Sequence, residues 1–207
     1  MSEFVSQRMP RKRAVNAQKL LAAAFILLSS LLVGCAYSIH PLYQEGKTVL
    51  EPGIAGTWLG ENQDGSKVEI ILAEAEHNSY KATCTDPASN RTVVYDIYLL
   101  RLGDQLYADM LLTDNKIGET DDDVGGLVPL HVFAKATVEK DTMTFLFLDG
   151  DWLKDQFTAH KLSIPHEDLD NETTILTAPP PKLQKLLRKI SSNPDAFAKP
   201  WVLHRKK

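Results

Sequence analysis

The chain has 207 residues, of which 43% are hydrophobic and 24% are charged, and its formal net charge is −4. The first 35 residues hold five of the 23 Lys and Arg and one of the 27 Asp and Glu, so the rest of the chain carries −8. This length suits a single domain with a full hydrophobic core. The acidic charge argues against a nucleic-acid partner, because nucleic-acid-binding proteins are basic.

The N-terminal segment joins a positive region to a short apolar run. The run from Leu20 to Val33 contains no charged residue, and several Lys and Arg precede it. A helix needs about 20 apolar residues to span a bilayer, whereas a shorter run after positive charge is typical of a signal peptide. We therefore expect residues 1–34 to be a cleaved signal peptide.

The residues that close this run are Leu32, Val33, Gly34 and Cys35. This pattern resembles the lipobox of bacterial lipoprotein signal peptides. The resemblance implies that signal peptidase recognises Leu32, Val33 and Gly34, and that the Cys35 thiol is the lipid attachment site, with palmitate-type chains holding the protein at the membrane. Ala36 stands where an aspartate favours the inner membrane, which implies the periplasmic face of the outer membrane in a diderm bacterium. The alternative is an uncleaved anchor helix with an incidental cysteine.

Residues 35–53 are expected to be a lipidated tether, because Pro and Gly interrupt them and they show no hydrophobic period. A single β-rich domain is expected over residues 54–207. Cys84 is the only cysteine of that domain. With Cys35 lipidated, Cys84 has no disulfide partner, so we expect a buried and inert thiol.

Alternating apolar and polar residues, separated by short turns such as Gly103-Asp104, predict a series of strands. The eight expected strands cover residues 54–60, 67–73, 79–85, 91–101, 105–112, 130–138, 143–148 and 172–177. Short turns favour antiparallel neighbours, and closure of such a sheet removes its exposed edges. The predicted fold class is mainly β with minor α: an antiparallel eight-stranded barrel or a strongly curved sheet.

Two helices complete the expected domain. The first is a short inserted helix, Trp152 to His160, with Asp149 or Asp151 as its N-cap. The second is a C-terminal amphipathic helix over residues 181–191, with apolar residues at i, i+3, i+4 and i+7 and lysines on the other side. Its apolar stripe either packs on the sheet, which we favour, or lies on an anionic membrane. Residues 201–203 are expected to form a last short strand.

Gly56-Thr57-Trp58 resembles the Gly-x-Trp signature of lipocalins and related small barrels. The resemblance implies a lipocalin-like barrel in which Trp58 plugs the closed end; the alternative is an ordinary core tryptophan. The inserted helix and the missing paired cysteines depart from that family. The resemblance therefore does not decide whether the barrel closes or whether it contains a pocket. The Pro41-Leu42-Tyr43 stretch is also similar to that of uncharacterised small lipoproteins, a resemblance that carries no known activity.

His131 and Phe133 alternate on one expected strand face and are possible ligand-lining residues, although a half-buried histidine is an alternative. Catalytic residues are not predicted, because the Gly-x-Ser-x-Gly motif and Gly-rich phosphate loops are absent. The histidines lack metal-ligand spacing, and the acidic run 119–123 suits a solvated loop better than a cation site. We therefore expect no metal or cofactor.

These patterns predict a non-enzymatic, membrane-anchored lipoprotein of the bacterial cell envelope. In this hypothesis the barrel-like domain binds an apolar or amphiphilic small molecule. The alternative is a structural or assembly lipoprotein with a filled barrel that acts through envelope protein partners.

Overall fold

The computed structural model describes residues 34, 36–62, 65–88, 91–117, 120–121, 129–169 and 173–207. These residues belong to one compact unit, Gly34–Lys207. Leu32, Val33 and Cys35, three residues of the expected lipobox, lie outside the described residues, as does most of the acidic run 119–123. Within the described part, no helix combines the length and the apolar character that crossing a membrane requires.

Strands make up most of the described chain. They are β1 (Tyr37–Ser38), β2 (Gly56–Glu61), β3 (Lys67–Ala75), β4 (Ser79–Asp86), β5 (Arg91–Leu102), β6 (Gln105–Ile117), β7 (Thr120–Asp121), β8 (His131–Val138), β9 (Thr142–Phe147), β10 (His166–Leu169), β11 (Thr173–Leu176) and β12 (Trp201–Arg205). The helices are α2 (Gly150–Thr158), α3 (Pro180–Ile190) and a 3₁₀ turn, η2 (Pro194–Ala196).

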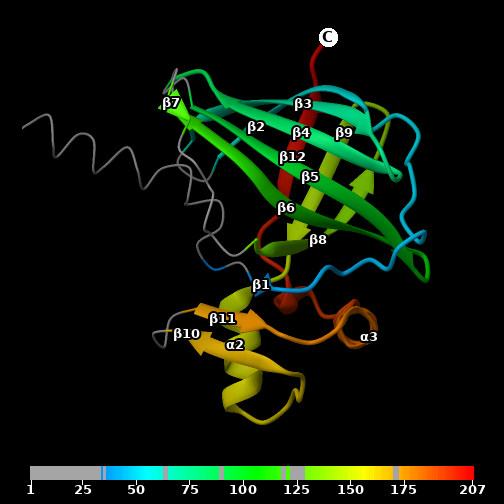
Figure 1. Cartoon of the computed structure of the whole chain (residues 1–207), viewed down its shortest axis with the longest axis vertical. Coiled ribbons are helices and arrows are strands. Elements are labelled where there is room, and N and C mark those ends of the chain that lie inside the picture. The colour runs from blue at the N-terminus through cyan, green and yellow to red at the C-terminus, as the bar shows by residue number, and fades with distance from the viewer. Residues whose placement is uncertain are drawn as a thin grey trace, which may run out of the picture. The chain divides into compact units, whose positions relative to one another are not determined.

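Eight antiparallel strands close into a barrel (Figure 1). Their order around the barrel is β2, β3, β4, β5, β6, β8, β9 and β12, and β12 pairs with both β9 and β2 to complete the ring. Closure gives each of these strands two neighbours and so removes the unpaired edges of an open sheet. This confirms the predicted mainly β fold, an architecture consistent with a lipocalin-like barrel that also carries two short helices.

The eighth barrel strand is not the one that the sequence indicated. Residues 172–177 were expected to fill that place, but β11 pairs with β10 and with β1 outside the barrel. The eighth strand is β12, which follows α3. Helix α2, strands β10 and β11 and helix α3 therefore form one insertion between the seventh and eighth barrel strands. Alternation identifies a half-buried strand but does not say which sheet it joins.

Both helices begin where local chemistry favours a helix start. The Asp149 carboxylate accepts a hydrogen bond from the backbone N–H of Trp152 at 2.8 Å, so Asp149, rather than Asp151, is the N-cap of α2. Proline occupies the first turn of α3, where a backbone N–H has no helical partner to lose. The apolar stripe of α3, which includes Leu183 and Leu187, is buried.

The insertion packs against the outside of the barrel and forms a second hydrophobic core there. The barrel strands contribute large residues from their outer face, such as Tyr107 and Phe133. The insertion contributes the buried faces of α2 and α3 and the end of β11. Burying each leucine of α3 is worth about 1.5–3 kcal/mol, so this contact fixes the helix on the barrel wall. The preferred interpretation of the α3 stripe, packing on the sheet, agrees with this arrangement.

Residues 36–53, expected to be a tether, are instead built into the domain. Ala36 and Leu42 are 1% and 0% exposed, respectively. Strand β1 lies between β11 and β8, and the N–H of Ala36 donates to the carbonyl of Leu148 at 3.0 Å. The prolines and glycines that suggested a flexible linker mark turns in a segment that packs along the barrel surface.

Candidate functional site: the barrel interior

Residues 47–55 lie across one end of the barrel. Thr48 Oγ1 donates to the carbonyl of His77 in the β3–β4 turn at 2.9 Å. The N–H of Val49 donates to the carbonyl of Leu99 on β5, also at 2.9 Å. This segment thereby binds the β3–β4 turn and the part of β5 just beyond Tyr98, the last β5 residue that pairs with β4, and it covers that end.

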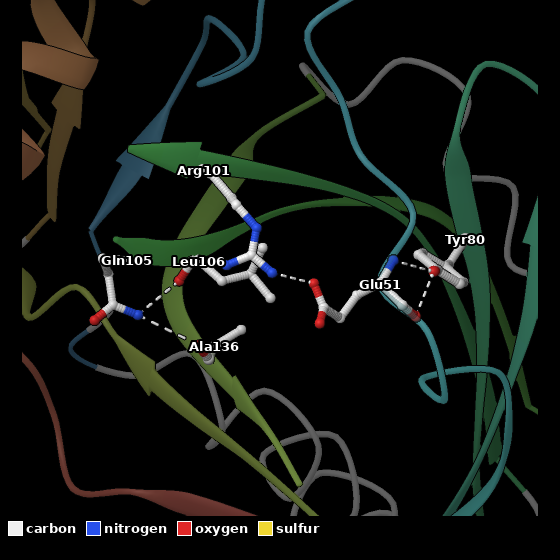
Figure 2. Close-up of polar contacts among 6 residues, drawn as sticks. All are labelled: Glu51, Tyr80, Arg101, Gln105, Leu106 and Ala136. Carbon is white, nitrogen blue, oxygen red and sulfur yellow. Dashed lines mark hydrogen bonds and ion pairs between the residues drawn. The ribbon is translucent and has the colours of Figure 1, made fainter. Parts of the chain in front are cut away.

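Glu51 is the centre of the polar contacts at this covered end, and Figure 2 shows it between Tyr80 and Arg101. The Tyr80 hydroxyl accepts from the N–H of Glu51 at 2.8 Å and donates to its carbonyl at 3.1 Å. The Glu51 carboxylate pairs with Arg101 at 2.5 Å. Nearby, the Gln105 side-chain amide bridges β6 and β8 by donating to the carbonyls of Leu106 and Ala136. These contacts satisfy the polar groups where the apolar interior ends.

Trp58 is fully buried at the same end, and Arg205 from the last barrel strand lies over its ring at 4.2 Å. The indole N–H of Trp58 donates to the carbonyl of Ile54 at 2.9 Å. The Arg205 guanidinium donates to the carbonyls of Gly53 and Ala55. A Cβ at Gly56 would lie 2.6 Å from Arg205 Nη1, and the φ of Gly56 is +135°, so a side chain at this position would displace the arginine.

The inner face of the barrel is apolar. Alternation along each strand, together with the cross-strand pairs, places directly paired residues on the same face. Examples of such pairs are Trp58 with Ile70 and Leu99 with Ala108. The buried inner-face residues include Trp58, Ile70, Leu72, Tyr80, Ile97, Leu99, Met143, Phe145 and Leu203. Large side chains therefore fill the half of the interior next to the covered end.

The inner face is accessible further along β4, β5 and β6. Cys84, Tyr95 and Leu112 belong to it, because Ala82 and Leu112 pair with Tyr95 and Val93 pairs with Cys84. All three are only partly buried, in contrast to the residues near Trp58. These three residues therefore form an inward-facing wall that is partly exposed, in contrast to the filled interior near Trp58.

Cys84 is one of these partly buried residues, and burial raises the pKa of its thiol to about 12. The thiol is therefore protonated near neutral pH and is a poor nucleophile. The raised pKa agrees with the expectation of an inert thiol. Slow chemical modification of the same thiol can report whether this wall is accessible.

His131 and Phe133, predicted as possible ligand-lining residues, lie on the outer face of β8 instead. Phe133 belongs to the second core, and His131 shares its face by alternation. The inner face of β8 carries small residues such as Ala134 and Ala136. The insertion covers the outer face of β8, so both faces of this strand are buried and alternation does not identify the interior.

His131 takes part in a buried polar contact that the sequence did not indicate. Its Nδ1 lies 2.7 Å from Oδ1 of Asp109, which is fully buried on the neighbouring strand β6. Asp109 Oδ2 accepts from the N–H of Leu42 at 2.6 Å. Burial raises the pKa of Asp109, while His131 and the backbone N–H groups of Leu42 and Tyr43 oppose that rise. The pair fastens the segment after β1 to the outer barrel wall.

Among the described residues, His, Cys, Asp and Glu form no group of three that is suited to a metal ion. Sequence reasoning missed the polar residues Asp109, Glu51 and Arg205, because the topology brings each of them to partners far away in the sequence. Gly56 before Trp58 was the one local sign of a close approach.

No protein-family model, curated protein or solved structure matches this chain.

Proposed function

We propose that the protein is a lipid-anchored envelope lipoprotein whose barrel binds an apolar or amphiphilic small molecule. The observation that carries the binding part of this proposal is the difference between the two halves of the interior. The half near Trp58 is filled, whereas Cys84, Tyr95 and Leu112 present an accessible apolar wall. An apolar ligand gains about 25 cal/mol per Å² of apolar surface that it buries, so such a wall favours a hydrocarbon chain or a flat apolar ring.

The anchor part of the proposal rests on the sequence around Cys35. Its N-terminal neighbours are a positive region and an apolar run, which support export and lipid attachment. Ala36, the next residue, is buried in the domain. A lipid on Cys35 would hold the barrel close to the bilayer surface, without a flexible spacer. Such placement suits a protein that exchanges an amphiphile with a membrane.

The binding proposal is tested by titrating residues 36–207 with a fluorescent fatty acid. We expect saturable binding that unlabelled fatty acid displaces. Leu112→Trp fills the partly exposed wall and is expected to weaken binding about tenfold, because it removes space for a few methylene groups at about 0.8 kcal/mol each. Leu59→Trp adds the same side chain on the outer face, where Leu59 is exposed, and is expected to bind like the wild type. Absence of saturable binding, or equal loss in the two variants, would instead favour the filled structural barrel.

A further inference from the structure

A positively charged groove lies outside the barrel, between α3 and the segment that connects α2 to β10. Its volume is about 760 Å³. Lys182, Lys185 and Lys189 of α3 form one wall, and Lys161 belongs to the connecting segment. Leu162 and Ile164, which are partly exposed, contribute apolar surface, and none of the described residues that line the groove is acidic. The groove therefore concentrates four positive charges on a protein body that is otherwise acidic.

Among the described residues, these lysines have no counter-charge of their own. Within the described part of the chain, no ion pair or side-chain hydrogen bond involves the ammonium groups of Lys161, Lys182, Lys185 or Lys189. Like charges three or four positions apart on a helix destabilise it by about 0.2–0.5 kcal/mol per pair. A bound anion would relieve this repulsion.

The helix holds the lysines at fixed places along the groove. Residues 182, 185 and 189 follow i, i+3 and i+7 spacing, so they share one side of α3 and extend over about 10 Å at 1.5 Å per residue. The buried stripe that includes Leu183 and Leu187 prevents the helix from turning this side away. Because the same stripe is covered by the barrel, α3 has no free apolar face for insertion into a membrane.

We propose that this groove binds an extended phosphorylated anion with negative charges about 5–10 Å apart, its uncharged part against Leu162 and Ile164. The spacing of the helix lysines sets the separation of the charges, and Lys161 closes on the ligand from the other side. The anion is either a soluble phosphorylated compound or the headgroup of an anionic lipid, since both present the same phosphate chemistry. This inference is independent of the apolar barrel interior.

The test is calorimetric titration of the full chain, in neutral detergent at low salt, with tripolyphosphate. We expect saturable binding that weakens with added salt. Lys185→Glu/Lys189→Glu is expected to weaken it about tenfold or more, and Lys185→Arg/Lys189→Arg to retain it. The matched control, Lys47→Glu/Lys140→Glu, makes the same change in net charge at exposed lysines outside the groove and is expected to lower affinity less than about twofold.

A second arm distinguishes the two sources of the phosphate. Detergent micelles that contain phosphatidylglycerol compete with tripolyphosphate if the ligand is a lipid headgroup and do not compete if it is a soluble compound; either result supports the groove. Failure of the wild type to bind tripolyphosphate would overturn the proposal. Equal weakening in the groove variant and the control variant would also overturn it, since binding would then depend on net charge alone.

Discussion

Asp109→Leu tests the buried contact that holds the segment after β1 to the barrel. The substitution removes a fully buried carboxylate that binds His131 and accepts from the backbone N–H groups of Leu42 and Tyr43. Three buried polar groups lose their partner, and each unsatisfied group costs about 1–3 kcal/mol. At the lower end of the sum over these three groups, we expect a loss of about 3–5 kcal/mol of unfolding free energy.

Urea unfolding of residues 36–207, followed by circular dichroism, measures this loss. The double variant Asp109→Leu/His131→Leu removes both polar partners and is expected to regain at least about 1 kcal/mol relative to the single variant. Asp96→Leu is the control, because Asp96 pairs with Lys81 at the surface and its loss costs less than about 1 kcal/mol. A single variant within about 1 kcal/mol of the wild type, or a double variant no better than the single, would refute the reasoning.

Three further predictions follow from the covered end, the thiol and the N-terminus. Gly56→Val places a Cβ 2.6 Å from Arg205 Nη1 at a φ of +135°. Thermal unfolding should therefore show that the free energy of unfolding falls by about 1–3 kcal/mol. An unchanged unfolding midpoint would contradict the packing described for Arg205. With its pKa raised to about 12, Cys84 should react with a small maleimide about tenfold faster per pH unit from pH 7 to 10, and a plateau near pH 9 would show an ordinary thiol. Cys35→Ala should abolish labelling by a palmitate analogue and leave the precursor uncleaved; labelling that persists in this variant would disprove lipid attachment at Cys35.

Local patterns predicted the strands of the barrel well, because a half-buried strand of an antiparallel sheet leaves a clear alternation. Both helices were also predicted, from the Asp149 cap and the stripe of α3. The eighth barrel strand was missed because β11 and β12 are both short half-buried strands. Their partners are set by tertiary contacts, which a pattern within one strand does not contain.

The site was harder to predict than the fold. Gly56 and Trp58 were singled out from the sequence, but Arg205 lies about 150 residues away and no local signal connects it to them. His131 stood out in the sequence, but the pattern around it does not show that it lies on the outer face of the barrel. Its strand is buried on both faces, and a two-residue period carries no sign of which face is the interior. The partner Asp109 lies in a run of consecutive buried residues on β6. The insertion covers the outer face of this strand, so the sequence of β6 does not alternate between buried and exposed positions there.

The most direct test of the central claim is the rate at which a small maleimide modifies Cys84 in residues 36–207, with and without saturating fatty acid. Cys84 is the only cysteine of residues 36–207 and lies on the partly exposed wall of the interior. If an apolar ligand occupies that wall, fatty acid should slow modification about tenfold or more at pH 9, and Leu112→Trp should remove most of this protection. An equal rate with and without fatty acid would contradict a ligand-binding interior and would point to a barrel with a structural role.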